Sequence, residues 1–221
     1  MTHNVAQLKT RKYSADLDRG LDPELLKRRM LELFRSPTYK PPLLPAVALE
    51  LLELTRRPRT GAAEIVSLMG HDPVLAGQVL RLARSALYSG GQPLRSLDEA
   101  VTRLGLSRIS DLLLQVSLEA TVFRAAGFRE VMNSLRRHCV FVAEASRIVE
   151  KHVMSCNPSA FLCGLLHDVG VAACILALGG PLKGLAPLGF DQAWPSVGEV
   201  HAECSELLAQ IWGLPADVAS V

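Results

Sequence analysis

Apolar residues recur along this chain at intervals of three and four positions, the spacing that gathers side chains on one face of an α-helix. The first such stretch covers residues 22–35, where Asp22 and Pro23 are residue types favoured at the N-cap and the first position of a helix. No stretch of the sequence alternates apolar and polar residues as a half-buried β-strand does. The pattern therefore predicts an all-α fold.

Turn-forming and capping residues divide the rest of the chain into further helices. Four prolines break the chain at 36–45, and a second Asp-Pro pair begins at Asp72. Ser followed three residues later by Glu, which is the pattern of a capping box, occurs at Ser96 and again at Ser196 after a Gly/Pro-rich loop over 179–196. These signals predict helices over residues 46–57, 61–70, 72–89, 96–105, 107–127, 128–153, 157–170 and 196–213.

The composition agrees with packed helices. Hydrophobic residues make up 49% of the 221 residues and aromatic residues 5%, with Leu, Ala and Val predominant. Five cysteines without a C-x-x-C pair predict reduced thiols in a cytoplasmic protein. The N-terminal residues lack the apolar segment of a secretory signal, and the apolar stretch at 169–180 is too short to cross a bilayer. We therefore expect no membrane partner.

Charge is distributed unevenly along the chain. Lys and Arg are in excess by six over residues 1–150, whereas Asp and Glu are in excess by four over residues 151–221. This asymmetry fits a phosphate-bearing partner for the first part of the chain, and it equally fits an ordinary solvated face. Nucleic acid is disfavoured as that partner, because the basic part lacks aromatic stacking residues and any known nucleic-acid-binding motif.

Three histidines and one aspartate are predicted to meet in the C-terminal part of the chain. His138 lies in the apolar stripe of one predicted helix and His201 in that of the last one, while His167 and Asp168 close the helix between them. These three helices are expected to pack together, so the sequence predicts one cluster of three imidazoles and a carboxylate. The stripe around His138 consists of Val131, Leu135, Val142, Ala145 and Val149, which predicts a buried histidine.

Such a cluster suits a metal ion. Imidazole nitrogens and a carboxylate oxygen form an acceptable ligand set for Zn, Mn or Fe, and a bound metal lowers the pKa of a coordinated water for phosphoester hydrolysis. Taken singly, each histidine is also explained as a core residue with one hydrogen bond. Cys163 and Cys204 lie beside the histidines in the sequence, and each is interpreted either as a thiolate ligand or as a small buried hydrophobic residue.

The order of His138, His167-Asp168 and His201 resembles that of the HD superfamily of metal-dependent phosphohydrolases, and six segments between residues 40 and 221 resemble its HDOD (HD-related output domain) branch. The resemblance implies a two-lobed helical fold, and we expect an N-terminal lobe at 21–127 and an HD-like lobe at 128–221, preceded by a polar, loosely ordered arm at 1–20. It also implies a role in bacterial signal transduction. The segments are PPLLPAVALELLEL, HDPVLAGQVLRLARSALYS, PLRSLDEAVTRLGLSRISDLLL, RRHCVFVA, AFLCGLLHDVG and HAECSELLAQIWGLPADV.

Three departures from the family pattern bear on activity. Val171 stands in HDVGV where the branch that cleaves cyclic-di-GMP has a Lys. Arg84 stands where the HDOD pattern usually has Asn. The further His pair and Asp that follow WGLP in the hydrolase branch are missing before Val221. We therefore expect a metal set of at most three His and one Asp, and we assign no catalytic residue.

Two functions follow as hypotheses. The first is a non-catalytic signalling or adaptor domain that binds a partner protein or a nucleotide and carries a degenerate HD site. The second is a metal-dependent phosphohydrolase acting on a nucleotide or cyclic dinucleotide, with His138, His167, Asp168 and His201 as metal ligands. In this second reading, phosphate is held by the basic residues Arg81, Arg84, Arg103 and Arg108.

Overall fold

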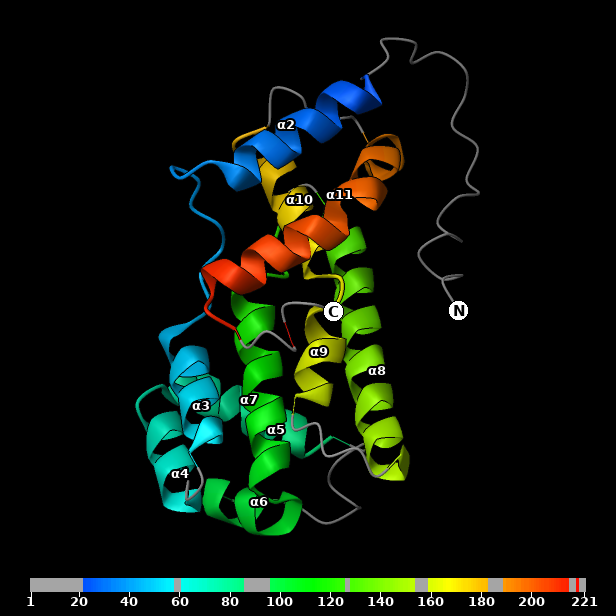
Figure 1. Cartoon of the computed structure of the whole chain (residues 1–221). Helices are drawn as coiled ribbons and strands as arrows, with labels where there is room; N and C mark the ends of the chain where they lie inside the picture. The colour runs from blue at the N-terminus through cyan, green and yellow to red at the C-terminus, as the bar shows by residue number, and fades with distance from the viewer. Residues whose placement is uncertain are drawn as a thin grey trace. The chain divides into compact units, whose positions relative to one another are not determined.

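A computed structural model describes residues 22–57, 61–85, 96–125, 128–153, 159–182, 189–214 and 218. All regular secondary structure within these ranges is α-helical, which confirms the predicted fold class (Figure 1). The chain divides into two compact units, one formed by Leu44–Thr121 and the other by Met1–Leu43 with Val122–Val221. This division differs from the predicted lobes at 21–127 and 128–221 in two ways, because the first described helix belongs with the C-terminal part of the chain and the second boundary follows Thr121.

The unit Leu44–Thr121 is built around one buried helix, α7 (Leu106–Thr121). Every residue from Ile109 to Leu118 is buried, so α7 is covered on all sides. Within this unit it packs against α3, α5 and α6. The helices that accompany it are α3 (Ala46–Arg56), α4 (Ala62–Gly70), α5 (Pro73–Ala83) and α6 (Leu97–Leu104).

The predicted start signals of three helices are present as side-chain caps. Asp22 accepts a hydrogen bond from the Glu24 amide at 3.0 Å at the start of α2 (Pro23–Arg35). Asp72 accepts bonds from two amides of α5, each at 3.0 Å. Ser96 accepts one from the Glu99 amide at 3.1 Å at the start of α6. Each cap satisfies amides that the helix itself leaves without partners.

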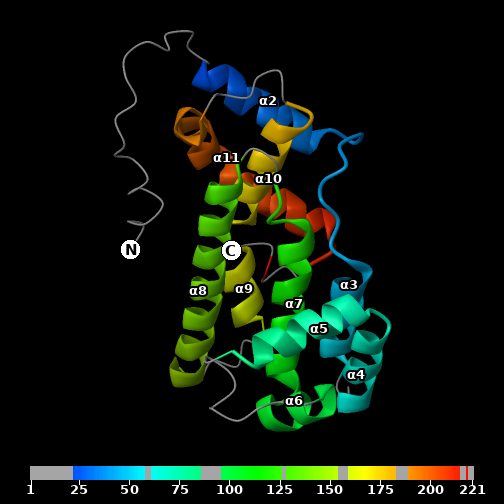
Figure 2. The same ribbon diagram turned by 180° about the vertical axis from the view of Figure 1, so that it is seen from behind.

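In the part of the chain that the structure describes, the other unit contains five helices with three main packing interfaces. Helix α8 (Arg129–Val153) packs against α9 (Ala160–Leu166), α10 (Val169–Gly179) packs against α11 (Phe190–Ile211), and α11 packs against α2. Figures 1 and 2 show the α8–α9 and α10–α11 pairs from opposite sides. The buried core of this unit is dominated by α9 and α10, where almost every side chain is excluded from solvent.

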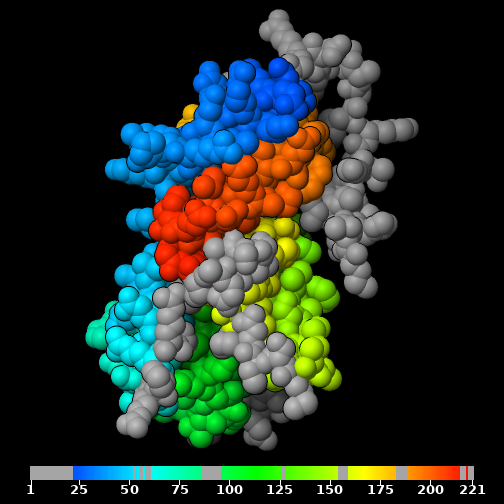
Figure 3. All heavy atoms as spheres, in the orientation of Figure 1, coloured from blue at the N-terminus to red at the C-terminus, as the bar shows by residue number. Residues whose placement is uncertain are grey.

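Helix α11 begins at Phe190, so the capping box predicted at Ser196 is wrong. Its buried positions Phe190, Ala193, Val197, Val200, Cys204 and Leu208 keep helical spacing from the first residue, and burial of that face outweighs the start signal at Ser196. The Ser196 hydroxyl instead donates to the Pro23 carbonyl at 2.8 Å, and the Glu199 carboxylate pairs with Lys27 at 2.8 Å. Both groups attach α2 to α11, whose side chains lie against each other along the face seen in Figure 3.

The helix predicted over 157–170 is shorter and is followed directly by a second one. Asn157 and Pro158, its predicted first residues, lie outside the described part of the chain. The segment Ala160–Gly179 is, by length and composition, apolar enough to cross a membrane, with a mean hydropathy of 2.1. However, 78% of its most apolar window is buried within the protein, and α8 and α11 pack against its two halves. Burial in the core thus accounts for its composition.

Candidate metal centre

The His167-Asp168 pair lies at the break between two helices. Helix α9 ends at Leu166, and α10 begins at Val169 with Asp168 at its N-cap position. The Asp168 carboxylate makes no hydrogen bond to the amides of α10 and lies beside imidazoles instead. A negative charge at this place is also favoured by the dipole of α10. The carboxylate can therefore occur inside an apolar stretch, because it lies at the break between two helices.

Three imidazoles surround this carboxylate, each with its Nε2 atom nearest to it. The distances from Asp168 Oδ2 are 3.3 Å to His167 and 3.5 Å to His138, and His201 lies 3.8 Å from Oδ1. The Nε2 atoms of His138 and His167 are 3.1 Å apart. The structure thus brings together all four residues that the sequence analysis had grouped.

Backbone carbonyls fix the orientation of two of these rings. His167 Nδ1 donates to the Gly164 carbonyl at 2.8 Å, and His201 Nδ1 donates to the Gly198 carbonyl at 2.9 Å. In the neutral form of each ring, the proton held on Nδ1 leaves the Nε2 lone pair directed to the cluster. This is the arrangement that metal-bound histidines usually have, with the second nitrogen bonded to a carbonyl or carboxylate.

The spacing of the donor atoms fits one metal ion. Two ligand atoms bound at about 2.1 Å lie roughly 3.0 Å apart in octahedral and roughly 3.4 Å apart in tetrahedral coordination. The separations within His138, His167 and Asp168 are 3.1, 3.3 and 3.5 Å. Among the described residues these three form the one group of His, Cys, Asp or Glu compact enough for an ion, and His201 stands next to the other carboxylate oxygen.

Two glycines allow the helices to approach closely enough for this cluster. A Cβ atom on Gly164 would lie 2.7 Å from the Ala143 Cα of α8, and one on Gly170 would lie 2.0 Å from the His201 carbonyl of α11. In addition, the Gly170 amide donates to the Ser205 hydroxyl at 2.8 Å. Gly164 thus positions α9 on the helix that carries His138, and Gly170 positions α10 on the helix that carries His201. The sequence analysis missed both roles.

The buried face of α8 differs from the apolar stripe that the sequence predicts. Its buried residues are Met132, Leu135, Cys139 and Ala143, whereas Val149 is 57% exposed. The close contact between Gly164 and Ala143 sets this orientation. His138 consequently lies at the edge of the buried face, with 28% of its side chain exposed, so the prediction of a buried histidine is wrong. Solvent can reach the cluster at this point.

The two cysteines considered as ligands lie outside this group. The Cys204 thiol is buried and lies 3.8 Å from the Cys174 thiol, on the interface of α11 with α10. Cys163 is half-buried on α9, and the metal-sized group does not include it. The interpretation of Cys204 as a small buried residue therefore fits the structure better than that of a ligand.

The four arginines proposed to hold phosphate all lie in the unit Leu44–Thr121. Arg81 and Arg84 are exposed at the end of α5. Arg103 is bonded to Glu99 at 2.6 Å, and Arg108 lies 3.8 Å from Asp111 with only 15% of its side chain exposed. Two of the four are thus engaged by carboxylates of their own helices, and their role toward phosphate stays a prediction.

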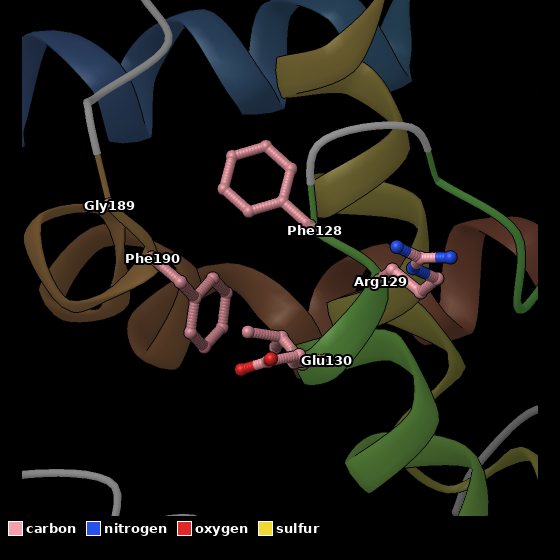
Figure 4. A pocket seen from close by; sticks show the side chains of 6 residues that line it. Phe128, Arg129, Glu130, Gly189 and Phe190 are labelled. Carbon is pink, nitrogen blue, oxygen red and sulfur yellow. The ribbon is translucent and has the colours of Figure 1, made fainter.

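A separate open hollow of about 400 Å³ lies between the first residues of α8 and α11. Phe128 and Phe190 face it from the two sides (Figure 4). Its remaining lining residues are Arg129, Glu130, Val131 and Gly189. None of the four cluster residues contributes to this hollow.

Even without a metal ion, the charges of Asp168 and His167 stabilise each other. Burial alone would raise the pKa of Asp168, but the hydrogen bond from His167 and the attraction of three imidazoles hold it below 3.8. Burial alone would lower the pKa of His167, but Asp168 and the Gly164 carbonyl raise it above 6.5. The pKa of His138 is lowered by burial and by repulsion from His167. A charged His167 beside an ionised Asp168 is thus favoured.

A pH dependence of stability follows for the chelator-treated protein. A depressed carboxyl pKa stabilises the fold above pH 3.8 and loses this effect as the pH falls, whereas a raised imidazole pKa stabilises it below pH 6.5 and loses this effect as the pH rises. We expect the difference in melting temperature between the wild type and Asp168→Asn to be largest between these two values. A difference that stays constant across that range in thermal denaturation would contradict this account.

A helical domain in which an adjacent His-Asp pair at a helix junction meets imidazoles from two further helices is an HD-type domain. The chain belongs to the HDOD family, because the model of the HDOD domain matches residues 42–221.

Solved structures share its fold. An HDOD domain protein of unknown function from Geobacter sulfurreducens is 24% identical, with a TM-score of 0.68 over 88% of this chain and 66% of that one. A proposed metal-dependent phosphohydrolase from Shewanella amazonensis SB2B is 23% identical, with a TM-score of 0.71 over 89% and 72%. A proposed signal transduction protein from Marinobacter aquaeolei VT8 is 20% identical, with a TM-score of 0.62 over 93% and 51%.

An uncharacterised protein of Treponema pallidum (strain Nichols) is 27% identical over 187 residues. The match covers 80% of this chain but 36% of that protein, so the chain spans about a third of the length of this relative.

Proposed function

We propose that this HDOD chain is a signal-transduction output domain that acts by binding a partner protein, and that its His-Asp cluster holds one metal ion without hydrolysing substrate. The observation that carries the proposal is the make-up of the cluster. It offers three imidazoles and a single carboxylate, which suffice for one ion, whereas in-line attack on a phosphodiester commonly uses two.

The residue after the HDVG segment supports a non-hydrolytic role. Val171 stands where the cyclic-di-GMP-cleaving branch has Lys, and its side chain is only 3% exposed in the core of α10. This position therefore supplies no cation to a phosphate group. The metal would be held by His138, His167 and Asp168, with His201 beside them, and would act as a Lewis acid toward a bound water. In our proposal its role is to hold α8, α9, α10 and α11 in one arrangement that the partner recognises.

Phosphohydrolysis is the second candidate, and one observation favours it. Between 21% and 29% of the side-chain area of each of the four cluster residues is exposed, so water has access to them. The proposed phosphohydrolase from Shewanella amazonensis has the same fold, which is a further reason to test this chain for hydrolysis.

The test is a hydrolysis assay on protein loaded in turn with Fe, Mn and Zn. Bis(p-nitrophenyl) phosphate and cyclic-di-GMP are the substrates, and Asp168→Asn is the matched variant because it removes the charge while keeping the size of the side chain. We expect about one ion per wild-type chain by elemental analysis and equal, background rates for both proteins. Turnover that depends on the metal and is lost in Asp168→Asn would establish the hydrolase and refute the output-domain proposal.

A further inference from the structure

The open hollow at the start of α8 and α11 has two aromatic walls. Phe128 and Phe190 face it from opposite sides (Figure 4). Phe190 is 8% exposed and its ring packs against the Trp194 ring, with 5.7 Å between the ring centroids, so this wall is held in place. The volume of about 400 Å³ lies at the low end of the range for small-molecule sites. A planar ring that enters between the two phenyl rings contacts an aromatic side chain on either side.

Two charged side chains line the same hollow. Arg129 and Glu130 are exposed in the first turn of α8, and neither forms a hydrogen bond or an ion pair with another residue in the described part of the chain. Figure 4 shows the Glu130 carboxylate pointing toward the Phe190 ring and the Arg129 guanidinium on the other side of the hollow. The hollow thus offers a hydrogen-bond acceptor beside its aromatic walls and a cation further away from them.

The carboxylate of Glu130 discriminates between planar bases. An ionised carboxylate has two acceptor oxygens and no donor. Guanine presents two adjacent donors, its N1–H and its N2 amino group, and can give one to each oxygen. Adenine and cytosine present a donor beside an acceptor nitrogen, and uracil presents one donor between two carbonyl oxygens. In these three bases a lone pair would face the carboxylate, so guanine is the base that matches it.

The guanidinium of Arg129 matches the other end of a nucleotide. Arginine binds phosphate oxygens through two parallel N–H donors, and a ribose separates the base of a nucleotide from its 5′-phosphate. A cation on the side of the hollow away from Phe190 therefore agrees with a phosphate at that end.

We propose that this hollow binds a guanine mononucleotide. The base lies between the rings of Phe128 and Phe190. Its N1–H and N2 amino group donate to Glu130, and its phosphate binds Arg129. Stacking on aromatic side chains and one charge-assisted contact at each end are consistent with a dissociation constant on the order of 50 µM in an open site. The inference does not depend on the metal or on the proposed function, because none of the four cluster residues lines the hollow.

Isothermal titration calorimetry of the full chain with GMP, AMP and guanosine tests the site. We expect AMP to bind at least tenfold more weakly than GMP, because adenine turns a lone pair toward Glu130. Guanosine lacks the phosphate and should bind about tenfold more weakly than GMP. Absence of GMP binding up to about 1 mM, or equal affinities for GMP and AMP, would overturn the inference.

Substitutions of the two charged residues test each contact. Glu130→Gln has one acceptor and one donor, which is complementary to adenine, so GMP should bind at least tenfold more weakly and AMP should come within about threefold of it. Arg129→Gln should weaken GMP binding about tenfold and leave guanosine binding unchanged. The matched control is Arg137→Gln, on the same helix but outside the hollow, which should bind as the wild type does. Unchanged GMP affinity in both Glu130→Gln and Arg129→Gln refutes the site.

Two further variants separate the hollow from the His-Asp cluster. Phe128→Leu keeps an apolar side chain but removes one aromatic wall, and we expect GMP to bind at least about fivefold more weakly. Asp168→Asn alters the cluster and not the hollow, so it should bind GMP with wild-type affinity. GMP binding that is lost in Asp168→Asn and retained in Phe128→Leu would assign the nucleotide to the cluster and contradict the proposal.

Discussion

Replacing Gly170 by Ala is expected to destabilise the protein by about 3 kcal/mol, at the upper end of the usual cost of overpacking. The added Cβ would lie 2.0 Å from the His201 carbonyl and 2.7 Å from the Ser205 amide, both backbone atoms of α11. Because a backbone cannot rotate out of the way as a side chain can, α10 and α11 must separate. Their separation moves Asp168 away from His201, so the variant should also lose the cluster.

Gly77→Ala on α5 is the matched control for this change. A Cβ at Gly77 meets nothing within 4 Å, so the same substitution should stabilise the protein by about 0.5–1 kcal/mol. Urea denaturation of both variants measures the two effects. If Gly170→Ala costs less than about 1 kcal/mol, the close approach of α10 to α11 does not hold the site together.

Replacing His167 by Ala should have the largest effect on metal binding, with a loss of affinity of at least about 100-fold. Its Nε2 lies 3.1 Å from His138 Nε2 and 3.3 Å from Asp168 Oδ2, so it is close to both other members of the metal-sized group. Its Nδ1 is fixed by the Gly164 carbonyl. No neighbouring ring can take its place without moving a helix.

Competition with a chromophoric chelator measures the affinity, and His71→Ala provides a control at a histidine outside the cluster. We also expect metal to raise the melting temperature of the wild type and of His71→Ala but not that of His167→Ala, since a ligand stabilises only the state that binds it. Unchanged affinity in His167→Ala would mean that the cluster is a hydrogen-bonded joint of the helices and holds no metal.

Local signals predicted those parts of the fold that depend on neighbouring residues. Asp22 and Asp72 cap the helices that their Asp-Pro pairs indicate, because a cap requires only the next two or three amides. The start of α11 was predicted at Ser196 instead of Phe190, because burial of Phe190 and Ala193 outweighs the local start signal at Ser196. A capping pattern contains no information on which residues are buried by other helices.

The sequence was sufficient to identify the four cluster residues. It was not sufficient to explain why their helices approach each other so closely. The spacing of apolar residues placed His201 on one face of α11 and His167 at the end of an apolar helix, whereas the buried face of α8 was predicted wrongly and His138 lies at its edge. The close approach of those helices depends on Gly164 and Gly170, and a signal for it was present. Glycine lowers helix stability relative to alanine, so two glycines beside a His-Asp pair in an apolar run indicate close packing. The direction of each Nε2 atom depends on backbone carbonyl groups, and these reach their positions only in the folded chain.

The attachment of α2 to α11 has a consequence for the order in which the chain folds. The partners of α2 are more than 160 residues further along the chain, with Arg35 bonded to Glu203 and the Pro23 carbonyl bonded to the Ser196 hydroxyl. During synthesis, α2 therefore emerges from the ribosome long before its binding surface exists, whereas Leu44–Thr121 has all its helices in one continuous segment. That unit can fold first, and α11, which is made later, completes the unit to which α2 belongs.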